Sequence, residues 1–239
     1  MTEIVRHPDA DTLAAAVAER FIDRLASVQG SGRVPHVGLT GGTIANHLYR
    51  AVAASPRRDQ VEWTSVEFWW GDERFVARDS GDRNAVQAHE AMLDSLGVRR
   101  ARIHQMPSTD DGDLESGARA YGEEVRAYGA GSFDVLLLGL GPDGHIASLF
   151  PGYPQLTVDD RVAVAVEDSP KPPPQRISLT YGALNRSTTV WFLVSGSGKA
   201  DAAARSLSEN TTVSESPATG VRGEAETVWH LDEEAASAR

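Results

Sequence analysis

Cysteine is absent from this sequence of 239 residues, and long apolar runs are absent as well. Without cysteine the chain forms no disulfide bond, no thiolate zinc site and no cysteine nucleophile. The longest apolar stretches, such as residues 135–138, are far shorter than the roughly 20 residues that cross a bilayer. Charged side chains interrupt the N-terminal segment, where an export signal needs an apolar core. We therefore expect a cytoplasmic protein that does not bind membranes.

Positive charge is also scarce relative to negative charge. The sequence has 23 basic and 34 acidic residues, and its formal net charge is −11. Such a charge repels nucleic acids at long range, and the sequence has no basic stripe interleaved with aromatic residues. Nucleic acid is therefore excluded as a partner. A phosphorylated small molecule would have to meet a local cluster of basic side chains.

Apolar spacing predicts alternating helices and strands. Residues 12–28 have helical spacing, so we expect a helix to come first, and residues 34–39 predict a strand that enters a glycine turn and a second helix. Residues 133–138 are almost wholly apolar, which is typical of a strand in a parallel sheet covered by helices on both faces. Further strands are expected at residues 66–70, 161–166, 176–180 and 189–194, and further helices at residues 85–96 and 198–207. The pattern predicts a doubly wound α/β fold, and the lack of a linker predicts a single domain over residues 1–239.

A glycine turn follows the first predicted strand, and open parallel sheets bind ligands beyond the carboxyl ends of their strands. Gly41, Gly42 and Thr43 join that strand to a helix start, where free N–H groups and the helix dipole favour an anion. The two glycines would let the backbone approach a phosphate closely. The alternative interpretation is an ordinary tight turn in which Thr43 caps the helix.

A second polar segment, Asp72-Glu73-Arg74, leaves the strand that ends near residue 70. Two acids and an arginine are costly to bury without partners, and Arg74 could bind a phosphate or carboxylate bidentately. The alternative is a surface ion pair between Arg74 and Asp72 or Glu73, which contributes little. The position at a strand end favours contact with a substrate.

The loop after the apolar strand has the sequence Gly-Leu-Gly-Pro-Asp-Gly-His over residues 139–145. It matches the G-x-G-x-x-G pattern of dinucleotide-binding enzymes, but three features exclude a nicotinamide cofactor. Pro151 and Pro154 break the long helix that should follow the glycines. Asp143 would place a carboxylate beside the pyrophosphate, and Pro142 removes a backbone donor. The glycines instead expose the acid and the histidine of the loop.

His145 is the predicted general base, because imidazole titrates near neutral pH and can take a proton from water. Asp143 could fix its tautomer and raise its basicity. A histidine that only hydrogen-bonds the backbone of its turn is the alternative. That structural role is expected for the other histidines, namely His7, His36, His47, His89, His104 and His230.

Two further cations lie at the starts of predicted elements. Lys199 begins a helix after a strand, where an ammonium can hold a phosphate, although residues 193–200 lack the first glycine and the final Ser or Thr of a P-loop. Arg176 is the first residue of a predicted strand, and its charge could likewise hold a phosphate. A solvated surface side chain is the alternative for both. No Gly-x-Ser-x-Gly elbow or His-Glu-x-x-His helix is present, which excludes serine hydrolases and metalloproteases of those types.

Residues 133–151, FDVLLLGLGPDGHIASLFP, closely resemble the signature of the 6-phosphogluconolactonases. Other segments match in family order along nearly the whole chain: Gly41-Gly42-Thr43, residues 70–76, Asp79-Ser80 with Asn84, residues 176–180, Gly198-Lys199, and Trp229 with Asp232. The resemblance implies a three-layer α/β/α fold with an open, mainly parallel sheet, similar to that of glucosamine-6-phosphate deaminase and ribose-5-phosphate isomerase. It also implies hydrolysis of 6-phospho-D-glucono-1,5-lactone to 6-phosphogluconate, a step of the oxidative pentose phosphate pathway, without a metal or cofactor.

The same resemblance implies roles for individual residues. His145 activates the water that attacks the lactone carbonyl, and Asp143 positions His145. The residues implied to hold the substrate, mainly its phosphate, are Gly41, Gly42, Thr43, Asp72, Arg74, Arg176 and Lys199. The partner is then a small sugar-phosphate lactone, and the chain is expected to be a monomer or a homodimer.

The sequence departs from the family pattern at two positions near these residues. Ile44 stands where related sequences often have proline, and Arg83 stands where serine is frequent. Glucosamine-6-phosphate deaminase is the rival enzyme, but it typically has tyrosine after its Asp-Glu pair, where this chain has Arg74. It also has an Asn-Glu-Pro segment after its histidine loop, where this chain has residues 148–151. A non-catalytic sugar-phosphate sensor is the other alternative, although we expect no DNA-binding module before the first strand.

Overall fold

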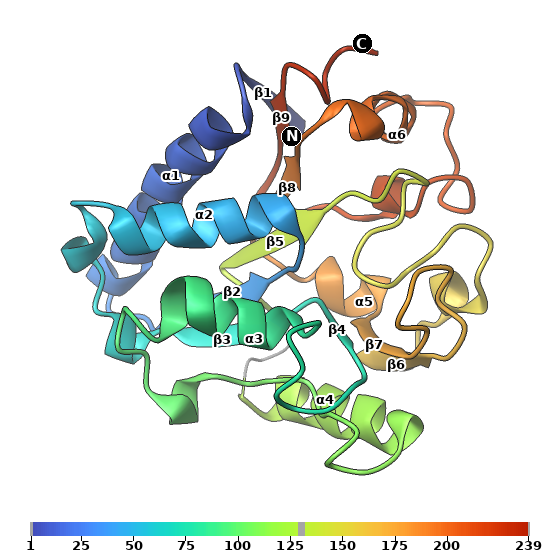
Figure 1. Ribbon diagram of the computed structural model, residues 1–239, viewed down its shortest axis with the longest axis horizontal. Helices are drawn as coiled ribbons and strands as arrows, with labels where there is room; N and C mark the ends of the chain where they lie inside the picture. The colour runs from blue at the N-terminus through green and yellow to red at the C-terminus, as the bar shows by residue number, and fades with distance from the viewer. Residues whose placement is uncertain (1, 129–131, 239) are drawn as a thin grey trace.

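Strands and helices alternate along the chain in the computed structural model, which describes residues 2–128 and 132–238 (Figure 1). The strands are β1 (Thr2–His7), β2 (His36–Leu39), β3 (Glu67–Trp70), β4 (Asp72–Arg74), β5 (Val135–Gly139), β6 (Ala163–Val166), β7 (Arg176–Leu179), β8 (Thr189–Val194) and β9 (Glu226–Asp232). The helices are α1 (Ala10–Gly30), α2 (Thr43–Ala54), α3 (Asn84–Ala88), α4 (Leu114–Tyr128), α5 (Tyr181–Leu184) and α6 (Ala200–Ser206). A π-helical segment, His89–Leu93, continues α3.

The larger sheet of the described residues is parallel throughout, in the order β1-β9-β8-β5-β2-β3. Every residue of β8 and the first four residues of β5 are buried, as expected for strands covered on both faces. Helices flank this sheet, and the prediction of an open, mainly parallel α/β/α fold is confirmed. The sheet brings the carboxyl ends of β2, β3, β5 and β8 to one edge, which is where the ligand site was expected.

A smaller antiparallel sheet, in the order β4-β7-β6, lies beside the main one. The strands predicted at residues 161–166 and 176–180 form, but they belong to this second sheet rather than to the parallel one. The connection between them, residues 167–175, contains no helix and is shorter than the dozen or more residues that a parallel crossover needs. Leu179 donates its N–H to the carbonyl of Gly71, which ties the small sheet to the end of β3.

Helix α1 confirms the first predicted helix and buries Leu13, Val17, Phe21 and Leu25. It packs against α2 on one face of the main sheet. The expectation that a helix comes first was wrong, because β1 precedes α1 and pairs with β9 at the edge of the sheet. Most of β1 is exposed or half-buried, so it lacks the apolar run that marks the central strands.

Helix α4 was missed in the sequence, although its buried residues Leu114, Ala118, Tyr121 and Val125 have helical spacing. Two glycines in α4 obscure that pattern. A Cβ at Gly117 would lie 3.3 Å from Ile177, and one at Gly122 would lie 3.3 Å from the backbone of Ala163. The glycines therefore let α4 pack closely on the small sheet. Among the described residues, no helix is long and apolar enough to cross a membrane.

Candidate active site

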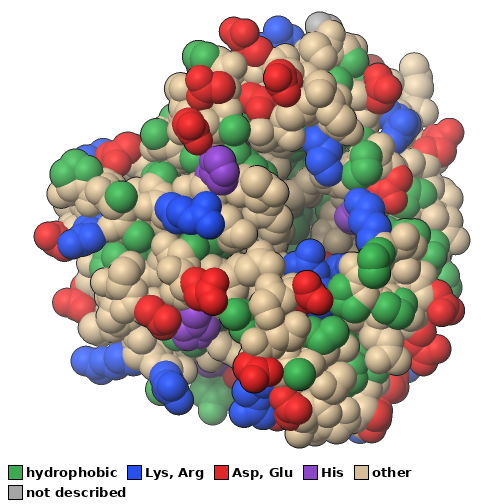
Figure 2. Space-filling model, in the orientation of Figure 1, with side chains coloured by type: hydrophobic (Ala, Val, Ile, Leu, Met, Phe, Trp, Pro, Cys, Tyr) green, Lys and Arg blue, Asp and Glu red, His purple; other side chains and the backbone are tan. Residues whose placement is uncertain are grey.

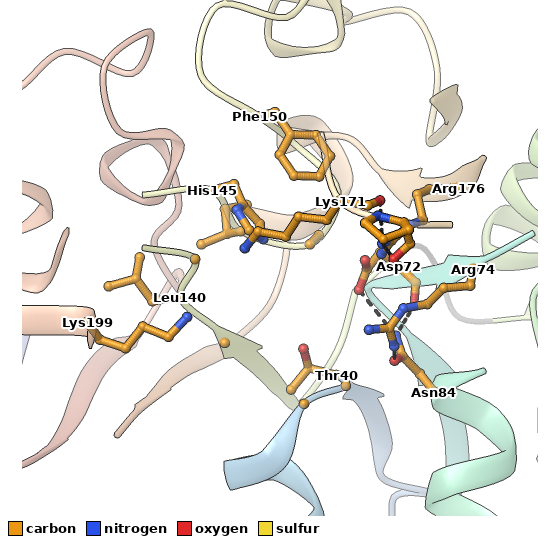
Figure 3. Close-up of a pocket in the computed structure, with 17 residues that line it drawn as sticks. Thr40, Asp72, Arg74, Asn84, Leu140, His145, Phe150, Lys171, Arg176 and Lys199 are labelled. Atoms are coloured by element: carbon orange, nitrogen blue, oxygen red, sulfur yellow. Dashed lines mark hydrogen bonds between the residues drawn. The ribbon is translucent and has the colours of Figure 1, made fainter. Parts of the chain in front are cut away.

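A cavity opens at the carboxyl edge of the main sheet, where Figure 2 shows a hollow with basic side chains around it. Its lining includes Gly41, Gly42, Asp72, Arg74, His145, Arg176 and Lys199, which come from segments far apart in the sequence (Figure 3). Thr43 lines an adjoining hollow that shares Gly41, Gly42 and Lys199. Asp143 does not line the cavity, but its carboxylate contacts the Nδ1 atom of the His145 ring. The structure thus brings the sequence-predicted residues together in one place.

His145 and Asp143 form a direct pair in the loop after β5. The His145 Nδ1 atom lies 2.5 Å from Asp143 Oδ1, and the His145 backbone N–H donates to the same oxygen at 3.3 Å. Burial alone would raise the pKa of Asp143, but the hydrogen bond and charge of His145 outweigh it and hold that pKa well below its usual range. An ionised carboxylate only accepts hydrogen bonds, so Nδ1 carries the proton. In the neutral form of the imidazole the lone pair then resides on Nε2, which can take a proton.

Glycine and an aromatic ring fix the orientation of His145. A Cβ on Gly141 would lie 2.0 Å from His145 Nδ1, so the ring occupies space that any other residue would fill. On the other side, the His145 ring packs against Phe150 with 4.6 Å between centroids. Gly144 has φ of +89°, a conformation that favours glycine in the turn between the acid and the base. The glycines that resemble a dinucleotide motif therefore shape a histidine site.

The start of α2 leaves backbone donors at the cavity. Gly42, with φ of +103°, is the N-cap residue, and within the described chain no side chain caps this helix. The alternative in which Thr43 is the cap is therefore wrong. A Cβ at Gly41 would lie 1.8 Å from Asn84 Oδ1, so Gly41 permits close approach of the two segments. A helix start without a side-chain cap retains N–H groups that an anion can accept from.

Arg74 does not form the surface ion pair considered as its alternative. Its guanidinium donates to Asn84 Oδ1, and the Asn84 amide donates to the backbone carbonyl of Asp72 at 2.9 Å. The Asp72 carboxylate accepts from Ser148 Oγ at 2.7 Å. Glu73, between Asp72 and Arg74, is turned away from the cavity and pairs with Arg83. Arg74 is therefore held by a neutral amide, which leaves its charge available to a substrate.

Arg74 and Arg176 occupy opposed positions on the antiparallel strands β4 and β7. Arg176 also donates from Nε to the carbonyl of Pro173 at 2.8 Å and from its Nη2 to the carbonyls of Lys171 and Pro172, both at 3.2 Å. It thereby orders the proline-rich loop that carries Lys171. Two arginines directly opposite each other repel, and the nearby Asp72 carboxylate opposes this repulsion.

Lys171 is a cation of the cavity that the sequence analysis missed. It lines the cavity together with Arg74, Arg176 and Lys199, so four cations gather there on a chain with a net charge of −11. Burial lowers the pKa of Lys171, Lys199 and Arg176, while the charge of Asp143 opposes this for the two lysines and that of Asp72 opposes it for Arg176. The sequence contained a clue to Lys171, because it has only two lysines and both face this cavity.

Within residues 2–128 and 132–238, no group of His, Asp and Glu side chains is placed to hold a metal ion.

Comparisons with known proteins identify the family of this chain. The family model described as glucosamine-6-phosphate isomerases/6-phosphogluconolactonase matches residues 8–229. The chain belongs to the glucosamine-6-phosphate isomerase/6-phosphogluconolactonase family. Within that family, it is 42% identical to a 6-phosphogluconolactonase of Streptomyces coelicolor, over 98% of this chain and 94% of the relative. It is 43% identical to a 6-phosphogluconolactonase of Mycobacterium tuberculosis, over 96% of this chain and 95% of the relative.

Solved structures of the family have the same fold. A 6-phosphogluconolactonase of Thermotoga maritima is 27% identical and superposes with a TM-score of 0.86 over 98% of this chain and 100% of that chain. A monomeric glucosamine-6-phosphate deaminase, 21% identical, superposes with a TM-score of 0.82 over 99% of this chain and 100% of that chain. The likeness to the deaminase concerns the fold alone, and it confirms the fold similarity that the sequence implied.

Proposed function

We propose that this chain is a 6-phosphogluconolactonase that hydrolyses 6-phospho-D-glucono-1,5-lactone to 6-phospho-D-gluconate. The observation that carries the proposal is the pairing of His145 with Asp143 at the wall of a cavity that also holds four cations. A base with a free Nε2 suits activation of water, and the cations suit a phosphorylated substrate. The near full-length similarity to bacterial 6-phosphogluconolactonases supports this reaction over that of the deaminase.

The reaction needs one base that later serves as an acid. His145 Nε2 takes a proton from water as the oxygen adds to the lactone carbonyl, and Asp143 stabilises the resulting imidazolium. The tetrahedral oxyanion then collapses, the bond from the carbonyl carbon to the ring oxygen breaks, and the imidazolium returns its proton to that oxygen. A positioned general base contributes roughly 10²–10⁴ in rate. Cations close to the developing oxyanion contribute a further electrostatic part.

Substrate binding is assigned to the other lining residues. The turn of Gly41, Gly42 and Thr43 offers backbone donors, and Lys199 and Arg74 lie on either side of that turn at the cavity. These groups suit the phosphate. Lys171 also lines the cavity and, like Lys199, feels the charge of Asp143. Asp72 and Arg176, held by Ser148 and by the loop carbonyls, complete the binding surface.

The extent of the functional unit is part of the proposal. We propose that residues 1–239 form one domain, because β1 near the start of the chain pairs with β9 near its end, across residues Thr2 to His7. The predictions of a cytoplasmic location and of a monomer or homodimer remain predictions.

The test is the rate at which freshly generated 6-phosphogluconolactone disappears with and without the purified protein. Acceleration above the spontaneous rate is expected, and equal rates would refute the proposal. Release of ammonia from glucosamine 6-phosphate would instead indicate the deaminase reaction. Binding of 6-phosphogluconate without any turnover would indicate a sensor.

A further inference from the structure

Glu73 is buried next to the cavity, and its carboxylate hydrogen-bonds the backbone of two residues that line it, Arg74 and Asn84. Its exposed fraction is 1%. The carboxylate accepts the backbone N–H groups of Arg74 and Asn84, each at 2.8 Å, and that of Ala85 at 2.9 Å. It therefore ties the end of β4 to the first turn of α3. The side chains of Arg74 and Asn84, hydrogen-bonded to each other, project from these two tied segments into the cavity.

Arg83 compensates the charge of this buried carboxylate. Its exposed fraction is also 1%, and its Nε lies 3.6 Å from Glu73 Oε2. Its Nη2 donates to the carbonyl of Met106, while Nε and Nη1 have no hydrogen-bond partner in the part of the chain that the structure describes. Burial raises the pKa of Glu73, and Arg83 is the largest opposing influence. A buried ion that loses its partner is strongly disfavoured, so Arg83 favours the carboxylate form of Glu73.

We propose that Arg83 is a positioning residue for substrate binding, which keeps Glu73 as a carboxylate beneath the cavity so that Glu73 holds Arg74 and Asn84 in place. Arg83 is absent from the lining of the cavity that contains His145. It faces a separate surface hollow with His104 and Met106. It therefore acts through Glu73 and not by contact with substrate. The inference rests on the proposed function, because its effect is read on a substrate held by Arg74.

The first experiment replaces Arg83 by a neutral side chain of similar length. In Arg83→Met, Glu73 becomes protonated and holds the N–H groups of Arg74 and Asn84 less firmly. We expect KM to rise about tenfold with a smaller change in kcat, because binding and not the base is disturbed. The affinity for 6-phosphogluconate, measured by calorimetry, should fall by a similar factor. Arg83→Lys retains the charge and should restore most of that affinity.

The control variant is Arg100→Met, since Arg100 is exposed and lines the same outer hollow as Arg83. It should leave KM and affinity unchanged. If Arg83→Met fails to fold, the double variant Glu73→Gln with Arg83→Met buries neither charge and serves in its place. Its affinity should equal that of Glu73→Gln alone, because Arg83 acts only through Glu73.

Two outcomes would overturn the inference. One is a folded Arg83→Met with unchanged KM and unchanged product affinity. The other is a double variant that binds 6-phosphogluconate clearly more weakly than Glu73→Gln alone. Failure of the proposed function is distinguishable, because wild-type protein would then not accelerate hydrolysis of the lactone, whereas the calorimetric comparison of variants does not depend on turnover.

Discussion

Arg74 of β4 stands directly opposite Arg176 of β7, and both guanidinium groups face the cavity that contains His145. Nearby positive charge is one reason why the pKa of Arg176 is lowered, although burial is the larger cause. Asp72 opposes the repulsion between the two arginines, and a dianionic phosphate between or beside the two groups would offset it further. Several measurable properties depend on this arrangement and on the histidine pair nearby.

Inorganic phosphate should stabilise the folded protein, because it binds the native cation cluster and not the unfolded chain. A ligand at about 100 times its dissociation constant adds roughly 2.7 kcal/mol of stability. Thermal unfolding with increasing phosphate should show a rising Tm. Arg74→Met should reduce this rise, whereas Arg100→Met, outside the cavity, should not. An equal rise in wild type and Arg74→Met would argue against Arg74 as a phosphate ligand.

Loss of the imidazole should remove the base without removing the binding site. We expect His145→Ala to lower kcat by roughly 10²–10⁴, the usual contribution of a general base. The affinity for 6-phosphogluconate should change little, because the four cations remain. Initial rates with fresh lactone and calorimetry with the product test the two statements separately. A kcat near the wild-type value in His145→Ala would mean that another group is the general base.

Asp143→Asn should lower kcat by at least about tenfold while KM stays near its wild-type value. Asparagine can still hydrogen-bond His145 Nδ1, but it has no charge to stabilise the imidazolium that forms when water is deprotonated. Because the pKa of Asp143 is held well below its usual range, the wild-type carboxylate stays ionised at mildly acidic pH. The pH dependence of kcat above pH 4 should therefore contain no contribution from Asp143. Full activity of Asp143→Asn would show that the 2.5 Å contact is structural.

A single methyl group added at Gly141, next to the His145 ring, should lower kcat. In Gly141→Ala the added Cβ would lie 2.0 Å from His145 Nδ1 and 2.5 Å from Asp143 Oδ1, so the ring must move. We expect kcat to fall by about tenfold or more, because misplacement by about 1 Å is enough to do so. Gly30→Ala is the matched control, since its Cβ would meet nothing within 4 Å. Steady-state kinetics on both variants, with Tm as a check on folding, would decide the point.

Stability should depend on pH through a buried histidine pair at the edge of the sheet. His7 Nε2 lies 3.1 Å from His230 Nδ1. Burial, followed by the charges of His7 and Arg20, lowers the pKa of His230 to about 3. Burial also lowers the pKa of His7, against the influence of Asp232.

The sign of the effect follows from proton uptake on unfolding. Below the ordinary histidine pKa of about 6.5 the unfolded chain binds a proton that folded His230 does not bind. Stability therefore falls as pH falls from about 6.5 toward 3, by up to about 1.4 kcal/mol per pH unit for His230, and the lowered pKa of His7 adds a decrease in the same direction. His230→Leu should reduce the slope of the unfolding free energy with pH in this range. An unchanged slope, measured by urea unfolding at several pH values, would contradict the account.

Local patterns were sufficient to predict much of the fold and the contact between Asp143 and His145. The apolar run at residues 133–138 identified a buried parallel strand, and helical spacing identified α1. The loop that contains Asp143 and His145 was also predictable, because the two residues are separated by one glycine and their contact depends on a single turn. Sequence failed where the pattern was weak, as in the exposed strand β1 and in the glycine-containing helix α4.

The composition of the substrate site was decided by tertiary structure. Arg74 and Arg176 are remote in sequence and meet only because β4 and β7 pair antiparallel in a small sheet that the apolar pattern did not separate from the main one. Lys171 joins them because Arg176 binds the carbonyls of its loop. In the sequence nothing distinguishes Glu73 and Arg83 from other charged residues. The folded structure shows that both are buried and form an ion pair. The sequence by itself determined the parallel sheet and the pairing of His145 with Asp143, since both depend on neighbours along the chain. The cation cluster and its support required the folded structure, since they depend on contacts between distant segments.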